Sequence, residues 1–262
     1  MLIKNIRLVP ELSGGTASDS GAVLIDGGKI RAVYATTPSD YTGDSIDGNG
    51  MTILPGLIDA HTHIACLRGY DSAQLHNPMK FFTSACFSTQ RYLDYGFTTI
   101  RDCGVPLRVN MAVRDAIDAG LFTGPRVIAC GLILSPTEYP EDDAMLDLYS
   151  CVDSQDTARS AARKELAEQA DFVKVMASGS ALHRHGIPVQ PIITEPELSA
   201  IVDAAEMKGS YGAAHAHGDG AIRLCVDTGV RTIEHASYIS DETLSELVKR
   251  DGCCLIPTSS AM

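Results

Sequence analysis

The feature that most restricts the fold is a repeated alternation, after Pro55, between short β-branched runs and longer amphipathic stretches. This rhythm is typical of parallel strands joined by right-handed helical crossovers. The predicted strands end near His61, Asp102, Gly131, Lys174, His215, His235 and Pro257, with helical patterns between them at 154–169, 195–208 and 241–250. Seven such units without a dinucleotide-binding glycine fingerprint favour an α/β fold of the (β/α)8 TIM barrel type over a doubly wound sheet.

The first 55 residues have a different texture, in which short strands alternate with Gly, Asp and Ser turns. The segment 21–34 (GAVLIDGGKIRAVY) is typical of a β-hairpin closed by a glycine turn. We therefore predict a small β-module over 1–55, followed by a barrel domain over 56–262. That barrel is incomplete, because the sequence supplies about seven β/α units.

Charge and hydropathy narrow the possible partners. The chain has 21 basic and 33 acidic residues, a net charge of −12, so its surface should repel nucleic acid. The longest apolar stretches, at 127–130 and 132–134, are too short to span a bilayer. The first residues lack a secretory pattern and the eight cysteines include no CxxC pair, which together predict a cytoplasmic protein with no membrane partner.

Two histidines, His61 and His63, follow a predicted strand in the run PGLIDAHTH. Residues two apart on a strand point to the same face, so both imidazoles can converge on one metal ion. His215 and His235 end two later strands. Each could separately be a core histidine bound to a backbone carbonyl, but strand ends of a barrel share one rim. We therefore interpret the four histidines as one cluster.

Lys174 lies inside the apolar run 172–176 (FVKVM), where a strand should be buried on both faces. A lysine with its ordinary pKa of about 10.4 would place a charge there. Its ammonium could reach the rim or pair with a carboxylate. Alternatively, a desolvated free amine could take up carbon dioxide and become a carbamate able to bridge two metal ions. The sequence leaves these possibilities open.

Four motifs in this order, PGLIDAHTH, FVKVMASGS, AAHAHGDGAI and TIEHA, resemble the metal-dependent amidohydrolase superfamily. The resemblance is strongest to its imidazolonepropionase-related and Xaa-Pro or Xaa-Arg dipeptidase-like branch. It implies a distorted TIM barrel beside a small β-sandwich built from both chain ends, of which 1–55 would be the N-terminal part.

The resemblance also implies two divalent metal ions, which we expect to be zinc. His61 and His63 would bind the first ion and His215 and His235 the second, with Lys174 as N6-carboxylysine bridging both. Lys174 and His217 are the predicted catalytic residues within the chain. His217 is assigned to substrate contact, and an exchange of roles between His215 and His217 stays open.

The implied reaction is hydrolysis of an amide or peptide C–N bond by a hydroxide that bridges the two metals. The family's general base is an Asp at the end of the eighth strand, which we expect beyond Met262, so the chain is interpreted as C-terminally truncated. One alternative is a deaminase of cyclic amidine or nucleobase-type substrates, or an imidazolonepropionase-like ring hydrolase. Another is a truncated, catalytically inactive chain.

Substrate specificity should come from the loops that follow the strands. His183 and Arg184, in the loop 178–188, and Tyr238, just beyond His235, are the predicted substrate-binding residues. Arginine can bind a carboxylate through two hydrogen bonds, so we expect an N-acyl amino acid or a dipeptide with a free carboxylate. A solvated loop without such a role is the alternative. An incomplete barrel exposes strand edges, from which we expect a homo-oligomer.

Overall fold

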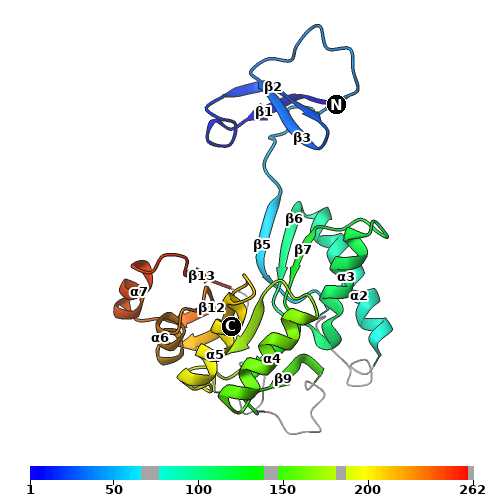
Figure 1. The fold of residues 1–262 in the computed structure, drawn as a ribbon. Coiled ribbons are helices and arrows are strands. Elements are labelled where there is room, and N and C mark those ends of the chain that lie inside the picture. The colour runs from blue at the N-terminus through cyan, green and yellow to red at the C-terminus, as the bar shows by residue number, and fades with distance from the viewer. Residues whose placement is uncertain (66–76, 139–146, 181–186, 259–262) are drawn as a thin grey trace. The chain divides into compact units, whose positions relative to one another are not determined.

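The computed structural model describes residues 1–65, 77–138, 147–180 and 187–258, and the chain divides into two units, Met1–Gly56 and Leu57–Met262 (Figure 1). The first unit holds a four-stranded sheet of order β3-β2-β1-β4. Its strands are β1 (Leu2–Leu8), β2 (Ser18–Asp26), β3 (Lys29–Tyr34) and β4 (Ser45–Asp47), with a short 3-10 helix, η1 (Pro10–Leu12), after β1.

The predicted hairpin is confirmed as β2 and β3, which pair antiparallel. Gly27 and Gly28 form its turn with φ of +56° and +71°. A two-residue type I′ hairpin turn requires such left-handed values at both positions. The described residues of this unit form one sheet, whereas a sandwich needs two.

The named strands of the second unit pair in parallel, as predicted from the β-then-α rhythm. One sheet has the order β5-β6-β7 and the other the order β13-β12-β11-β10-β8-β9. A parallel bridge between Cys130, directly after β7, and Phe172, directly before β10, connects the two sheets. The strands are β5 (Leu57–Thr62), β6 (Phe97–Asp102), β7 (Arg126–Ala129), β8 (Ile133–Ser135), β9 (Tyr149–Cys151), β10 (Val173–Met176), β11 (Gly212–Gly218), β12 (Thr232–Tyr238) and β13 (Cys254–Ile256).

All seven predicted strands are present, and the structure adds β8 and β9. These two have three residues each, too few for an alternating pattern to appear in the sequence. β11 and β12 also continue for three residues past His215 and His235, respectively, instead of ending there. The histidines therefore lie within these strands.

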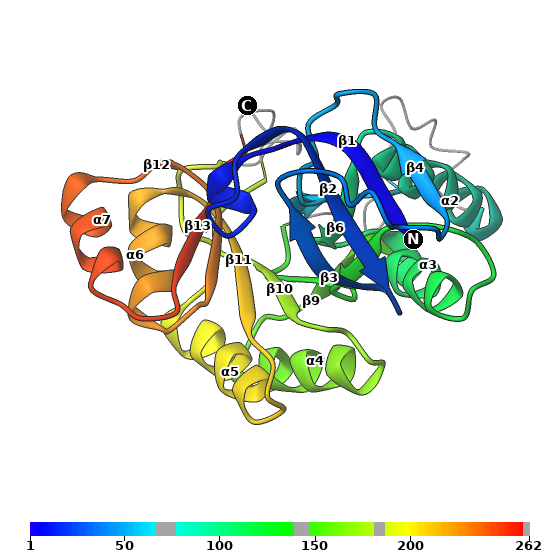
Figure 2. The same cartoon turned by 90° about the horizontal axis from the view of Figure 1, so that it is seen from above.

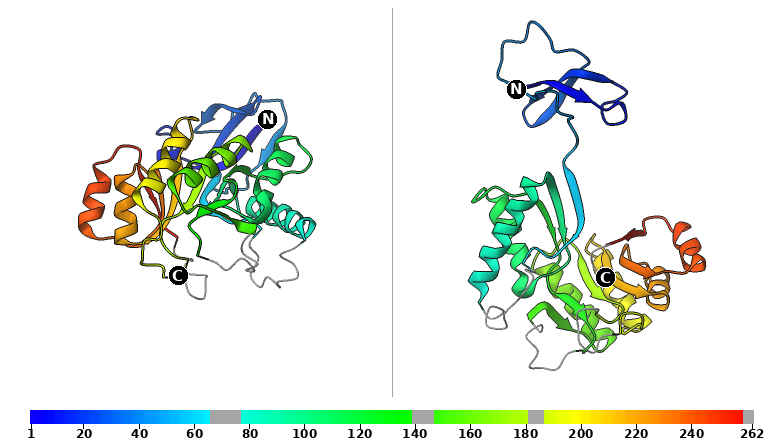
Figure 3. Two further views of the ribbon diagram at one scale, coloured as in Figure 1. Left: turned by 60° about the horizontal axis from the view of Figure 1, so that its bottom comes forward. Right: turned by 180° about the vertical axis from the view of Figure 1, so that it is seen from behind.

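In the second unit, helices follow the strands in the sequence and lie outside the sheets that these strands form. The helices are α2 (Pro78–Asp94), η2 (Pro106–Arg108), α3 (Val109–Asp118), α4 (Gln155–Ala167), α5 (Glu195–Glu206), α6 (Asp219–Asp227) and α7 (Asp241–Val248). Within this unit, α2 to α7 follow one another in an arc around the strands (Figure 2), and the rear view in Figure 3 shows the same order. In the described ranges, no helix has both the length and the apolar character needed to cross a bilayer.

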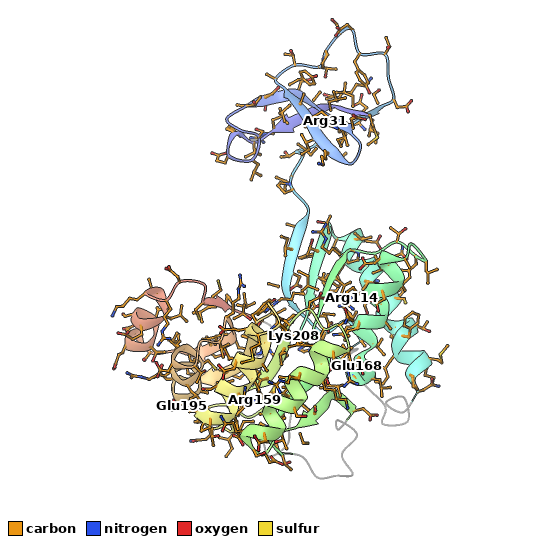
Figure 4. The ribbon with its side chains drawn as sticks, viewed as in Figure 1. Arg31, Arg114, Arg159, Glu168, Glu195 and Lys208 are labelled. Carbon is orange, nitrogen blue, oxygen red and sulfur yellow. The ribbon has the colours of Figure 1, made fainter. Side chains whose placement is uncertain are left out.

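Capping residues explain where several helices begin. The side chains of Asn77, Ser154 and Ser240 accept hydrogen bonds from backbone N–H groups in the first turns of α2, α4 and α7. Ion pairs then join neighbouring helices on the outside, as between Arg159 on α4 (Figure 4) and Asp203 on α5, at 3.8 Å. Exposed pairs of this kind contribute little to stability.

The main apolar core lies between α4–α7 and the strands β10–β12. Several strands nevertheless carry buried charged or polar side chains, which are costly unless something compensates them. The buried residues of this kind on β6, β10, β11 and β12 include Arg101, Lys174, His215, His217 and Glu234. Three of these strands, β10, β11 and β12, are neighbours in one sheet, and Arg101 on β6 reaches Glu234 on β12, so these residues mark the candidate site.

Candidate metal centre

Five histidines, four on the strands β5, β11 and β12 and one directly after β5, form one connected group, which we call the histidine cluster: His61, His63, His215, His217 and His235. The ring centroids of His61 and His63 lie 5.2 Å apart, and those of His61 and His235 lie 4.8 Å apart. His235 is in turn 4.7 Å from both His215 and His217. The potential ligand atoms of His215, His217 and His235 all lie within 4.8 Å of one another, close enough to share a metal ion.

Local backbone geometry directs these side chains. His215 and His217 are two apart on β11, so they share a face, as His61 and His63 do at the end of β5. β12 departs from this alternation, because His235 and Ala236 have φ of +73° and +50°, in the left-handed region. The consecutive side chains of Glu234 and His235 therefore both reach His61. Such strain is typical of functional sites.

Each ring of the histidine cluster has one nitrogen engaged by a protein atom. Nδ1 of His63 donates to the carbonyl oxygen of Gly104 at 2.6 Å, and Nε2 of His215 donates to that of Gly179 at 3.3 Å. These carbonyls can only accept, so the opposite nitrogens, Nε2 of His63 and Nδ1 of His215, keep their lone pairs. Metal-binding histidines are commonly oriented by such a second contact.

The remaining rings are held by side chains. Nδ1 of His217 lies 2.8 Å from the hydroxyl of Ser237, and Nδ1 of His235 is hydrogen-bonded to the hydroxyl of Thr258. A hydroxyl can donate or accept, so these contacts orient the rings without fixing the proton. The other nitrogen of these two rings, Nε2, is free to bind a ligand when the hydroxyl accepts and Nδ1 carries the proton.

Burial favours the uncharged form of four of these rings, those of His61, His215, His217 and His235. It lowers the pKa of His61 to about 4 and that of His235 to about 2, and it lowers the pKa of His215 well below its ordinary value. The nearby Lys174 ammonium contributes to each of these shifts. At neutral pH these four rings are therefore neutral imidazoles, the form that coordinates metal ions.

Lys174 on β10 is 2% exposed and lies close enough to influence four of the histidines. Among the described residues, its Nζ is buried without a hydrogen-bond partner. An unpaired buried ammonium is costly, and Glu234, which interacts with Lys174 electrostatically, forms no hydrogen bond with it. This orphaned nitrogen, in the midst of neutral imidazoles, fits a group that removes or compensates its charge.

Glu234 is a site residue that the sequence analysis did not identify. It is fully buried; its Oε1 accepts from Arg101 Nη2 at 2.5 Å, and its Oε2 accepts from His61 Nδ1 at 2.7 Å. Lys174, His61 and Arg101 hold the pKa of Glu234 well below its usual range, although burial alone would raise it. The sequence signal that could have identified Glu234 is its position as a charged residue inside the apolar run TIEHA, next to a histidine.

Asp102, at the end of β6, fixes the backbone beside His63. Its fully buried carboxylate accepts hydrogen bonds from the backbone N–H groups of Ile64 at 2.6 Å and Gly104 at 3.0 Å, and from the Asn110 amide at 2.7 Å. It thereby joins the segment that follows β5 to the one that follows β6. Gly104 is also the residue whose carbonyl orients His63.

The predicted substrate-binding residues have different positions. Tyr238 ends β12 and is 59% exposed, so its phenol can meet a ligand from solvent. His183 and Arg184 lie outside the described residues. A cavity of about 430 Å³ lies next to the histidine cluster, lined by residues 58–61 of β5 and 255–258 at β13. It includes His61 and Thr258, the hydrogen-bond partner of His235.

Comparison with known proteins shows which family model and which characterised proteins this chain matches. The family model described as "Amidohydrolase family" matches residues 52–262. Ochratoxinase from Aspergillus niger is 28% identical over 271 residues, an alignment that covers 92% of this chain and 55% of that enzyme. This chain therefore spans about half the length of that curated relative.

Two crystal structures are similar over nearly the whole chain. A prolidase complexed with N-methylphosphonate-L-proline has a TM-score of 0.85 and 27% identity, and a protein described as an amidohydrolase has a TM-score of 0.83 and 31% identity. Each comparison covers 98% of this chain and 65% of the other. The second unit thus shares its α/β arrangement with these proteins.

Proposed function

The chain belongs to the amidohydrolase family, whose relatives are hydrolases of carbon–nitrogen bonds, and from this premise we propose that it carries the metal centre of such a hydrolase. The proposed reaction is cleavage of an amide or peptide C–N bond in an N-acyl amino acid or a dipeptide-like substrate. The observation that carries the proposal is the convergence of five histidines, four of them close to the orphaned Nζ of Lys174.

The donor set fits a pair of divalent metal ions. His61 and His63 would hold one ion and His215 and His235 the other. Lys174, as N6-carboxylysine, would contact both, because a carbamate on Nζ turns an uncompensated ammonium into an anion. Imidazole and carboxylate-type ligands together suit zinc. Ions bound there would polarise a substrate carbonyl and increase the acidity of water.

The chain's own residues would prepare the site. Ser237 orients His217, whose ring stacks on that of His235 with 4.7 Å between centroids and 9° between planes. His217 would therefore contact the substrate beside the His215 and His235 pair. Tyr238 is exposed at the end of the same strand and would contact the substrate carboxylate. The phosphonate ligand of the similar prolidase carries an L-proline group, which supports a substrate of amino-acid type.

The proposal extends to the architecture. The strands β5, β6, β7 and β10–β13, with their helices in an arc outside them, would be seven strands of a distorted (β/α)8 barrel. The four-stranded sheet of the first unit would be one layer of a small β-sandwich. The histidines lie at the carboxyl-terminal end of β5 and from the middle of β11 and β12 onward, toward the strand ends at which barrels of this type place their active sites.

A hydrolysis assay tests the proposed function. From a protein that holds this chain together with the expected general base, we expect release of free amine from N-acetyl amino acids or dipeptides, at least about tenfold faster than from the matching C-terminal amides, because the carboxylate contributes binding energy. A chelator should abolish the reaction and added zinc should restore it, while the double variant His61→Asn/His63→Asn should stay inactive. Hydrolysis that persists in the chelator, or ammonia release from cyclic amidines alone, would contradict the proposal.

A further inference from the structure

We propose that Glu234 is a positioning residue that fixes the tautomer of His61. In this arrangement His61 carries its proton on Nδ1 and offers the lone pair of Nε2. The consequence for metal binding rests on the proposed function, because it assumes that His61 is a ligand. The juxtaposition itself involves β5, β6 and β12 and is independent of any ion.

The first support is that the two carboxylate oxygens of Glu234 have different hydrogen-bond partners. Oε1 of Glu234 accepts from Arg101 Nη2 at 2.5 Å and from the Thr232 hydroxyl at 2.8 Å. Oε2 lies 2.7 Å from His61 Nδ1. A carboxylate paired with a guanidinium can only accept, so Nδ1 of His61 must donate. The side chains of Glu234, Arg101 and His61 are 0%, 8% and 9% exposed, so water scarcely competes.

The second support is the rigidity of Arg101. Its Nε donates to the carbonyl oxygen of Ala60 at 2.7 Å, and its Nη1 donates to the Thr232 hydroxyl at 2.9 Å. The guanidinium also lies 5.0 Å from the ring centroid of Phe172. Ala60 directly precedes His61, so Arg101 holds the backbone of His61 and also the carboxylate that binds its ring.

The variant Glu234→Gln should reverse the tautomer. The Oε1 position receives two donors, from Arg101 and Thr232, so the amide oxygen must occupy it. The amide nitrogen then faces His61 Nδ1 and donates to it. His61 must therefore carry its proton on Nε2, the nitrogen that a metal would need. Loss of an orienting contact of this kind typically lowers metal affinity by about 10–100-fold.

The chain offers a matched control in Glu165. This carboxylate is also fully buried and paired with an arginine, because Arg108 donates to it from Nη2 at 2.5 Å and from Nε at 2.7 Å. It also accepts a hydrogen bond from the backbone N–H of Leu132, at 3.0 Å. Glu165→Gln therefore makes the same chemical change in a similar setting without touching His61. It should alter neither the tautomer of His61 nor the zinc affinity.

Two measurements on the purified protein decide the proposal. Nitrogen NMR of the metal-free protein should show His61 protonated on Nδ1 in the unaltered and Glu165→Gln proteins and on Nε2 in Glu234→Gln. Zinc titration against a competing chelator should show the loss of affinity in Glu234→Gln alone. An Nδ1 proton in Glu234→Gln, with the affinity of the Glu165→Gln control, would overturn the proposal. If the unaltered protein binds no zinc, the proposed function fails, but the NMR result still decides the role of Glu234.

A double variant distinguishes a change of the His61 tautomer from a general loss of folding. Glu234→Gln leaves the Arg101 charge buried without its partner, which is destabilising, whereas removing both charges is often tolerated. In Arg101→Met/Glu234→Gln the amide can turn its oxygen toward His61. The Nδ1 proton should return, and zinc affinity should recover toward that of the unaltered protein. An Nε2 proton in the double variant would contradict the role given to Arg101.

Discussion

Replacing Lys174 with methionine is expected to remove metal binding from at least one of two positions while making the metal-free protein more stable. Methionine has a similar length and no charge, so it removes a buried nitrogen that has no hydrogen-bond partner among the described residues. The free energy of unfolding should rise by about 1–3 kcal/mol, the cost of an unsatisfied buried polar group. Loss of a residue that only orients a metal ligand lowers activity by up to about a hundredfold. Lys174 would itself bind both ions, so hydrolytic activity should fall by at least that factor.

The informative result is that the two effects have opposite signs: the bound metal decreases while the free energy of unfolding increases. A lysine with a purely structural role would leave metal content unchanged when replaced. Lys249→Met is the control, since Lys249 is 67% exposed and pairs with Glu246 near the end of α7. That variant should change the free energy of unfolding by less than about 0.5 kcal/mol and leave metal content intact. Full metal content in Lys174→Met would contradict the bridging role.

Acid should destabilise the metal-free protein steeply between pH 6 and pH 5. His61, His215 and His235 are neutral in the fold because their pKa values are lowered, to about 4 for His61 and about 2 for His235. On unfolding, each regains a pKa near 6.5 and takes up a proton. The unfolded state therefore binds more protons, and stability falls as pH falls below about 6.5.

The expected magnitude follows from the number of protons. Each histidine contributes up to about 1.4 kcal/mol per pH unit, and the partial exposure of His235 reduces its share, so the loss from pH 6 to pH 5 should be about 3 kcal/mol. Below about pH 4.5 the lowered pKa of Glu234 adds to the loss. Urea unfolding with a chelator present measures this dependence. His235→Asn should reduce the slope by up to about a third, and a flat profile would show that the rings are not held neutral by burial.

The sequence predicted the parts of the fold that depend on periodicity. The seven strands and the helices α4, α5 and α7 were recognisable because alternation or amphipathic spacing continues over enough residues. The pairing of His61 with His63 followed from the two-residue period of a strand. The meeting of the histidines was predicted from the shared rim of a barrel, and the structure brings them together.

Other features of the site depend on contacts between distant segments. The left-handed backbone at His235 and Ala236 has no counterpart in their residue types, since neither is glycine. The contact from Arg101 to Glu234 joins residues 133 apart, and that from His61 to Glu234 joins residues 173 apart. Pattern reasoning finds charged residues in strands but cannot pair them, so Glu234 was missed.

The central claim is that the histidine cluster and Lys174 hold two divalent ions, and anomalous X-ray scattering from crystals grown with zinc tests it most directly. We predict two peaks, one about 2.1 Å from nitrogens of His61 and His63 and one at the same distance from nitrogens of His215 and His235, with density for a carboxylated Lys174 between them. Crystals that show no peak within the histidine cluster, with an unmodified Lys174 amine, would contradict the account.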